Sequence, residues 1–170
     1  VDKVDMIAGP GNVYVQLAKA QLAGAIGTDG FYGPSEIVVI ADESADPRCV
    51  AADLIAQAEH DPGKCFLVAW SADVIERFGN ELAEQLKRRT RVDAINRALQ
   101  DESAAILVAD ENQAAAVANT IAAENVNLAV ADPEQWLKRV RHGVEFFLGD
   151  QTPVASGDYY AGPSHCLPTG

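Results

Sequence analysis

The 170-residue sequence has few cysteines, few positive charges and no long apolar run. Its three cysteines, Cys49, Cys65 and Cys166, are far apart and form no CxxC pair, which argues against a thiolate zinc centre or a disulfide framework. Only 13 lysines and arginines face 25 acidic residues, and the net charge of −12 argues against a nucleic-acid partner because phosphates would be repelled. No apolar stretch is long enough to cross a bilayer. We therefore expect a cytoplasmic protein with reduced thiols and no membrane partner.

The composition is otherwise that of a globular protein. Apolar residues make up 48% of the sequence, which is enough for one core of ordinary size. The chain starts at Val1, and its only methionine is Met6. We therefore expect it to be a partial chain.

Short apolar runs alternate with amphipathic stretches from about residue 36 onward. The first run, 37–41, is continuous and β-branched, which is typical of a buried strand. Asp46 and Pro47 then fit the N-cap and first position of a helix. Strands are predicted at about 37–41, 65–70, 104–108, 126–130 and 144–148, and helices at about 46–59, 71–86, 91–99, 110–121 and 133–142. This alternation predicts an α/β fold with an open, mainly parallel sheet and helices on both faces, an incomplete Rossmann-like unit.

The first part of the chain has a different pattern. A Gly-Pro-Gly-Asn turn at 9–12 precedes a helix predicted over 13–22, and a glycine-rich link follows. We interpret residues 1–32 as the tail of a second α/β unit, joined to a main domain over 33–170. The turn could hold a phosphate or a dinucleotide on free backbone N–H groups, but such turns are also common without a ligand.

Two separate stretches carry polar groups that suit a metal. Gln57 and His60 are three residues apart on a predicted helix and share one face. Asp158 and His165 lie in a Gly/Pro-rich segment that we expect to be irregular. If the fold brings these stretches together, an amide oxygen, an imidazole and a carboxylate can converge on a borderline metal such as zinc. The residues alone equally allow polar groups at a frayed helix end and an Asp158 that makes an ordinary turn contact.

A second polar pair, Glu124 and Asn125, follows the helix predicted over 110–121. The pair is also consistent with a plain helix C-terminus in which Asn125 adopts the left-handed conformation.

A series of short motifs runs in order along nearly the whole chain. They are Val1-Asp2-Lys3, Gly9-Pro10-Gly11-Asn12, Gly33-Pro34-Ser35-Glu36, Gln57-Ala58-Glu59-His60, Phe147-Leu148-Gly149, Gly157-Asp158-Tyr159, and His165 with Leu167-Pro168-Thr169. In these motifs the sequence resembles the histidinol dehydrogenase family. The resemblance implies NAD-dependent oxidation of L-histidinol to L-histidine through the aldehyde, the last step of histidine biosynthesis. It also implies one zinc ion per site and a homodimer with sites shared between subunits.

The resemblance also implies roles for individual residues and segments. Residues 1–32 would belong to the NAD-binding unit and residues 33–170 to the domain on the zinc and substrate side. The implied zinc ligands are Gln57, His60 and Asp158, which would also bind the small-molecule alcohol substrate together with Ser35 and His165. Asn12 would contact the nicotinamide cofactor. Glu124 falls on the family's catalytic glutamate, which activates water for the second oxidation.

The sequence departs from the family pattern in two ways. Family members are longer, and the missing C-terminal part carries the fourth zinc ligand, so we expect the isolated chain to be inactive. The family's Pro-Glu-His motif reads Ala123-Glu124-Asn125 here, and an amide cannot accept a proton near neutral pH. Three alternatives follow: another base such as Glu124, a water or His165; a different small polar alcohol as substrate, such as a sulfonated diol; or a non-catalytic paralogue that binds zinc or ligand.

Overall fold

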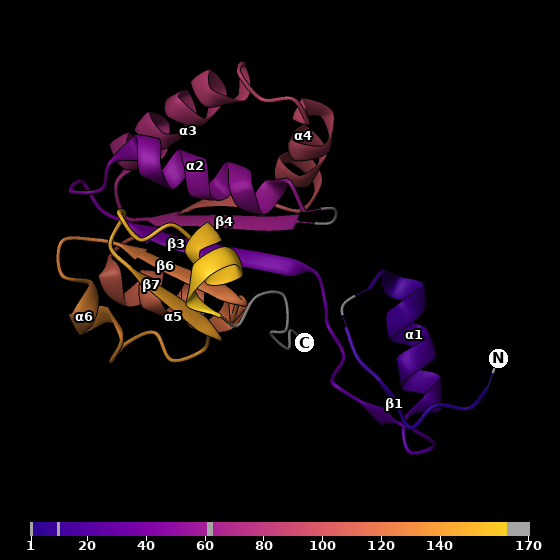
Figure 1. Cartoon of the computed structure of the whole chain (residues 1–170). Coiled ribbons are helices and arrows are strands. Elements are labelled where there is room, and N and C mark those ends of the chain that lie inside the picture. The colour runs from indigo at the N-terminus through magenta and orange to yellow at the C-terminus, as the bar shows by residue number, and fades with distance from the viewer. Residues whose placement is uncertain (1, 10, 61–62, 163–170) are drawn as a thin grey trace.

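The computed structural model describes residues 2–9, 11–60 and 63–162. Its first part is a small parallel β-α-β arrangement of β1 (Met6–Ile7), α1 (Val13–Leu22) and β2 (Gly27–Thr28). The rest is built around a separate five-stranded sheet. Figure 1 shows the small unit standing to one side of this sheet, next to the end where the chain enters the first long strand.

The five-stranded sheet is parallel throughout and has the order β5-β4-β3-β6-β7. Its strands are β3 (Ser35–Ala41), β4 (Gly63–Ala69), β5 (Ala104–Leu107), β6 (Asn125–Ala129) and β7 (Glu145–Leu148). The central strand β3 is buried from Ile37 to Ala41, which is why its sequence is a continuous apolar run. The prediction of a parallel α/β fold from alternating strands and helices is confirmed.

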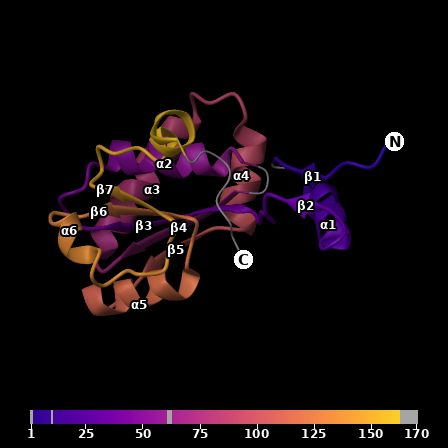
Figure 2. The same ribbon diagram turned by 60° about the horizontal axis from the view of Figure 1, so that its bottom comes forward.

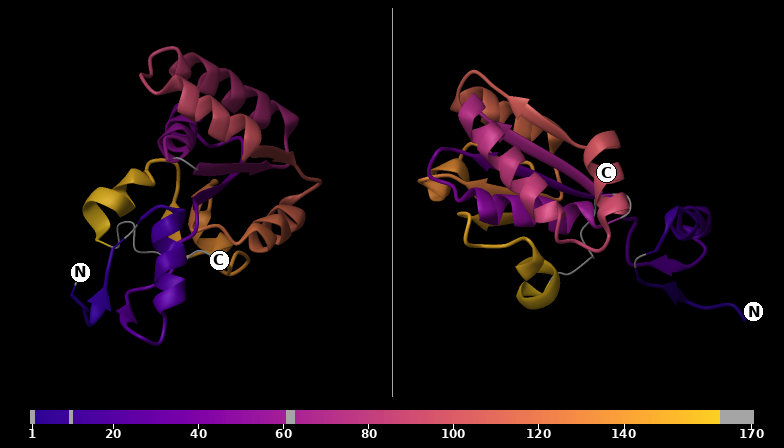
Figure 3. Two further views of the ribbon diagram at one scale, coloured as in Figure 1. Left: turned by 90° about the vertical axis from the view of Figure 1, so that its right-hand side faces the viewer. Right: turned by 90° about the horizontal axis from the view of Figure 1, so that it is seen from above.

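Helices cover both faces of the sheet. One face carries α2 (Pro47–Ala58), α3 (Ala72–Leu86) and α4 (Val92–Asp101), and the other carries α5 (Glu111–Ile121) and α6 (Pro133–Trp136). A short π-helix, η1 (Gly157–Ala161), lies on the α2 side (Figures 1 and 2). The two views of Figure 3 show these layers on either side of the strands. Each face has its own apolar core, so the sheet separates two clusters of buried side chains.

Local sequence signals explain where several helices begin. The Asp46 carboxylate accepts a hydrogen bond from the Arg48 backbone N–H at 2.9 Å, and Pro47 occupies the first turn of α2. Asp110 caps α5 in the same way through the Gln113 N–H at 2.9 Å. The predicted cap at Asp46 is confirmed. Ser71 stands at the N-cap position of α3, but its side chain makes no capping hydrogen bond.

One local prediction was wrong, and one of the alternatives left open does not hold. The helix predicted over 133–142 ends at Trp136, because the Asn119 side chain binds the chain that follows. The amide of Asn119 donates to the Arg139 carbonyl at 2.8 Å and accepts from the Arg141 N–H at 2.8 Å, which replaces helical hydrogen bonds. The left-handed residue after α5 is Ala122, with φ of 51°, whereas Asn125 begins β6.

The segment around Asp158 is also more regular than predicted. It forms η1 rather than an irregular loop. In the described part of the chain, no helix combines the length and the apolar composition needed to span a membrane.

Candidate functional site

The candidate polar residues gather at the edge of the sheet where the parallel strands begin, which we call the amino edge. Ser35 and Gly63 start β3 and β4 in register with each other, and Asn125 and Glu145 start β6 and β7 in register. Helix α2 must carry the chain back from the end of β3 to the start of β4, so its C-terminus also points to this edge. The C-terminal end of a helix carries partial negative charge and favours a cation.

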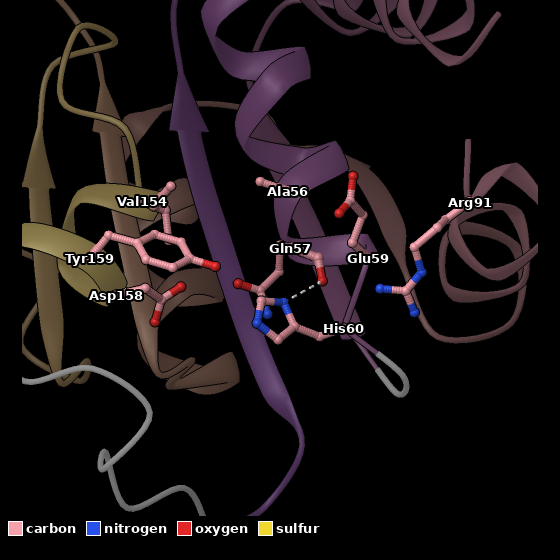
Figure 4. A pocket seen from close by; sticks show the side chains of 9 residues that line it. Ala56, Gln57, Glu59, His60, Arg91, Val154, Asp158 and Tyr159 are labelled. Atoms are coloured by element: carbon pink, nitrogen blue, oxygen red, sulfur yellow. Dashed lines mark hydrogen bonds between the residues drawn. The ribbon is translucent and has the colours of Figure 1, made fainter. Parts of the chain in front are cut away.

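Gln57, His60 and Asp158 line one pocket of about 280 Å³ at the amino edge. Gln57 belongs to the last turn of α2, and His60 follows that helix directly. Asp158 comes from η1, on the opposite wall. Figure 4 shows the side chains of Asp158 and Tyr159 facing those of Gln57 and His60. The other residues that line the pocket are Ala56, Glu59, Arg91, Val154 and Ala155.

Gln57 is buried with one amide group unsatisfied. Its side chain is 2% exposed, and its Nε2 has no hydrogen-bond partner. The oxygen and nitrogen of an amide are assigned from their partners, so a turned amide would place an oxygen at that position. The His60 ring is held at the helix end, where its Nδ1 lies 3.2 Å from the Gln57 carbonyl oxygen (Figure 4). These two groups and the Asp158 carboxylate provide the three donor types that the sequence suggested.

Histidine, cysteine and carboxylate side chains alone do not form a metal site in the described part of the chain. Within residues 2–9, 11–60 and 63–162, no group of three or more His, Cys, Asp and Glu side chains is placed to hold a metal. A metal site here would therefore need the Gln57 amide oxygen.

Glu124 lies beside this pocket and is directly bonded to Ser35. Its side chain is 8% exposed, and its Oε2 accepts a hydrogen bond from the Ser35 hydroxyl at 2.9 Å. Burial raises the pKa of the Glu124 carboxyl, and the charge of Asp158 adds to this rise, while bonds from Ser35 and from the Glu36 N–H oppose it. The structure thus joins two sequence-predicted site residues that are 89 positions apart.

Asn125 has a defined partner inside the fold. Its side chain is buried, and its Nδ2 donates a hydrogen bond to the Glu36 carbonyl oxygen at 3.2 Å. This bond ties the start of β6 to the start of β3. The Asn125 side chain therefore acts in part as a cross-strand link.

A buried polar group beneath the pocket was not found from the sequence. Asp53 precedes Gln57 by four residues on α2 and accepts hydrogen bonds from Asn127 and from the Val154 N–H. Burial raises the pKa of the Asp53 carboxyl to about 6. The signal that could have found it is the spacing of Asp53 and Gln57, since residues four apart share one helix face.

A second hollow lies between the small unit and the main sheet, and we call it the interunit cleft. It has a volume of about 540 Å³. Its walls include Asn12 from the small unit and Ser35 and His60 from the amino edge. The Asn12 carboxamide oxygen caps α1 by accepting from the Tyr14 and Val15 N–H groups, at 3.1 and 3.2 Å. Its Nδ2 is therefore the group of this side chain that would contact a cofactor.

The loop that carries Asn12 is held by a buried lysine. Lys19 is 1% exposed, and its ammonium group donates to the Asp29 carboxylate at 2.8 Å and to the Gly9 carbonyl oxygen at 2.5 Å. Asp29 also accepts from the Gly9 N–H at 2.6 Å. The hydrogen bond from Lys19 is the main cause that lowers the pKa of Asp29 to about 2.

One predicted site residue, His165, lies outside the described residues.

The comparisons with known proteins agree on one family. The family model for histidinol dehydrogenase matches residues 1–170. The histidinol dehydrogenase of Rhodopirellula baltica is 46% identical over 167 residues, which are 98% of this chain and 36% of that protein. That of Pseudomonas aeruginosa is 46% identical over 170 residues, 99% of this chain and 39% of that protein. The chain belongs to the histidinol dehydrogenase family.

The fold agrees with this membership. A crystal structure of histidinol dehydrogenase from Elizabethkingia anophelis, 34% identical in sequence, superposes with a TM-score of 0.91 over 99% of this chain and 39% of that one. The Delta-pyrroline-5-carboxylate dehydrogenase of Mycobacterium tuberculosis, 17% identical with a TM-score of 0.59, shares the fold alone. The chain therefore spans between a third and two fifths of the length of the histidinol dehydrogenases that it matches.

Proposed function

We propose that the protein carrying this chain oxidises L-histidinol to L-histidine through the aldehyde, with NAD and one zinc ion per site. The observation that carries the proposal is the meeting of Gln57, His60 and Asp158 in one pocket, next to the bonded pair of Ser35 and Glu124. Membership of the histidinol dehydrogenase family supports the choice of this alcohol over another small polar alcohol or a non-catalytic role.

The residues of the pocket fit a zinc ion. The buried Gln57 amide has one unsatisfied atom, and the C-terminus of α2 favours positive charge at this point. We propose that Gln57, His60 and Asp158 hold the ion, and the family resemblance adds His165 as a substrate-binding residue. Bound zinc would supply Lewis-acid and orienting chemistry for the substrate alcohol.

The interunit cleft fits a nicotinamide cofactor. Gly11, Asn12 and Val13 line it at the N-terminus of α1, where the positive end of the helix dipole favours a phosphate. We propose residues 1–32 as the tail of the NAD-binding unit and residues 33–170 as the zinc and substrate side. Bound NAD would supply the hydride acceptor for both oxidations.

Glu124 is the residue to which we assign proton transfer. Its pKa is raised by burial, which brings a carboxyl group closer to the pH at which it both accepts and donates protons. In the first oxidation the alcohol carbon loses a hydride and Glu124 takes the hydroxyl proton. Glu124 releases this proton to solvent before the second oxidation. It then takes a proton from the water that adds to the aldehyde, and the resulting hydrate anion loses the second hydride to leave the carboxylic acid. The hydroxyl of Ser35 orients the carboxylate through the 2.9 Å hydrogen bond.

Asn125 does not take part in proton transfer in this scheme, because an amide has no basic site near neutral pH. Its role is the link to the Glu36 carbonyl, which keeps the neighbouring Glu124 in place. From the family resemblance, we propose that the complete protein is a cytoplasmic homodimer with shared sites.

The metal site is tested by zinc titration of the complete protein that carries the chain. Asp158→Asn and His60→Ala should each weaken zinc binding by about 100-fold or more, since removal of even an outer partner of a ligand costs about 10–100-fold. Asp42→Asn is the control, because Asp42 binds Ser44 and Ala131 at the opposite edge of the sheet. Unchanged affinity in both site variants would contradict the proposed metal site.

A further inference from the structure

Helix α2 carries a second buried polar side chain one turn before the pocket. The Asp53 carboxylate, 4% exposed, accepts a hydrogen bond from the Asn127 Nδ2 at 2.8 Å and another from the Val154 N–H at 3.2 Å. These partners lie 74 and 101 positions away, on β6 and just before η1. The carboxylate thus joins α2 to two other parts of the chain.

This arrangement links the two walls of the pocket. Val154 lines the pocket and begins the turn that leads into η1, where Asp158 lies. Asp53 is on the same helix as Gln57, which stands on the opposite wall. The bond from Val154 to Asp53 therefore holds the segment of Asp158 against the helix of Gln57 and His60.

The setting of Asp53 is costly for a charged group. Leu54, the next residue, and Val154, its hydrogen-bond partner, belong to the buried apolar cluster of this face. None of the ion pairs found among the described residues includes Asp53. Removing a carboxylate from water is costly when no cation lies beside it, and here only the two hydrogen bonds offset that cost. The two bonds are therefore the feature of Asp53 that needs an explanation.

We propose that Asp53 is a positioning residue that sets the placement of Asp158 relative to Gln57 and His60, through its hydrogen bonds to Val154 and Asn127. This inference rests on the proposed function, because it assumes that these three residues form the metal site. Asp53 itself does not touch the metal or the substrate in this account.

Two substitutions of Asp53 separate positioning from packing. Asp53→Leu replaces the carboxylate by an apolar side chain of similar size and removes both acceptor oxygens. Asp53→Asn keeps an oxygen for the Val154 N–H. Its new N–H₂ can donate to the Asn127 Oδ1, which has no partner in the described structure, once the Asn127 amide turns over to present that oxygen. The leucine variant should therefore lose the tie, and the asparagine variant should retain it.

The experiment is a titration of the complete protein with Co²⁺ and Zn²⁺, with the visible spectrum of Co²⁺ reporting the ligand geometry. Asp53→Leu should weaken binding by about 10–100-fold and alter the spectrum. Asp53→Asn should bind within about threefold of the wild type and restore the spectrum, as expected when an outer partner is kept. Wild-type binding and spectrum in Asp53→Leu, or an Asp53→Asn variant as weak as Asp53→Leu, would overturn the proposal.

Hydrogen exchange of the Val154 amide in the unmodified protein is the second measurement, and it decides the matter if Asp53→Leu does not fold. Zinc should slow this exchange, because the ion fixes the segment of Asp158 from the other side. An unchanged exchange rate would overturn the proposal. If Asp158→Asn loses zinc affinity and Asp53→Leu keeps it, the positioning role of Asp53 is contradicted and the proposed metal site stands. If Asp158→Asn keeps its zinc affinity, the proposed metal site is contradicted, and the role of Asp53 is contradicted with it.

Discussion

Burial sets the pKa of two carboxyl groups at the site. Asp53 and Glu124 are both carboxyl groups with a raised pKa, and in both the principal cause is removal from water. Their surroundings give them different roles. Glu124 binds the Ser35 hydroxyl beside the pocket, whereas Asp53 binds a backbone N–H and an amide inside the core.

The raised pKa of Asp53 predicts an unusual dependence of stability on pH. In the fold the pKa rises from 3.8 to about 6, so the folded chain holds this proton more strongly than the unfolded chain. The stabilisation is fully present below about pH 4 and is lost as the pH rises through about 6, by about 3 kcal/mol in total. Asp53→Asn cannot ionise and escapes this loss.

The measurement is urea unfolding of both proteins between pH 4 and pH 7, with a chelator present. The free energy of unfolding of Asp53→Asn should gain about 3 kcal/mol over that of the wild type across this range. Parallel curves for the two proteins would show that Asp53 titrates normally. The comparison isolates Asp53 because all other acids are shared.

Some site residues are predictable from sequence and others are not. The spacing of Gln57 and His60 predicts one shared helix face, whereas α2 ends at Ala58 and His60 lies just after it, still on the same pocket. The pairing of Ser35 with Glu124, and of Asp53 with Val154, joins residues that are far apart in sequence, so no local pattern could show either contact. The roles of Ser35, Glu124 and Asn12 came from the family resemblance and stay predictions.

At the scale of elements, the position of the site is the informative feature. Ligands of open α/β sheets usually bind beyond the carboxyl ends of the strands. Here the candidate residues lie at the amino edge, where α2 ends and where Glu124 follows α5. Helix C-termini suit a cation, whereas the N-termini at the opposite edge suit an anion. The polarity of the helices is thus consistent with a metal at this edge.

Gly63 controls how closely β4 approaches the end of α2. A Cβ atom at this position would collide with the carbonyl oxygens of Gln57 and His60. Gly63→Ala should therefore displace the helix end, lower the free energy of unfolding by about 1–3 kcal/mol and weaken zinc binding by about tenfold or more. Denaturant unfolding and zinc titration measure the two effects.

Gly79→Ala on α3 is the matched control, because an added Cβ there meets nothing within 4 Å. This variant should be more stable by about 0.5–1 kcal/mol, as expected for alanine in a helix, with unchanged zinc affinity. Equal behaviour of the two variants would contradict the role of Gly63.

The strands and helices were largely predictable because each has a clear local pattern. The errors fall where distant side chains intervene. Asn119 ends α6 early by binding the residues after it, and this is not visible in the sequence of α6 itself. The short β1 and β2 strands were missed because each is only two residues long.

At the scale of the whole molecule, the small N-terminal unit buries far fewer apolar side chains than the domain built on the five-stranded sheet. In α1, the apolar side chains of Val13, Tyr14 and Leu17 are exposed, and the buried residue of this helix is Lys19. A two-stranded sheet with one helix is too small to be stable alone. Such an apolar surface is normally covered by another segment or a second copy.

Limited proteolysis of the 170-residue chain by itself tests this difference. Cleavage should come first in the glycine-rich link before Ser35 and leave the main domain intact, because local opening is easiest where few apolar side chains are buried. Mass spectrometry of the early products identifies the cut. First cleavage within the five-stranded sheet would contradict this view of the two units.

The central claim is that the complete protein oxidises histidinol twice at this site, although Asn125 replaces the family's histidine. The most direct measurement is the amount of NADH formed per L-histidinol consumed, with zinc present. The account predicts two NADH per histidinol, with the yield retained in Glu76→Gln on the exposed side of α3 and lost in Glu124→Gln. Zinc binding without any NADH would contradict the account and would favour another alcohol or a non-catalytic role.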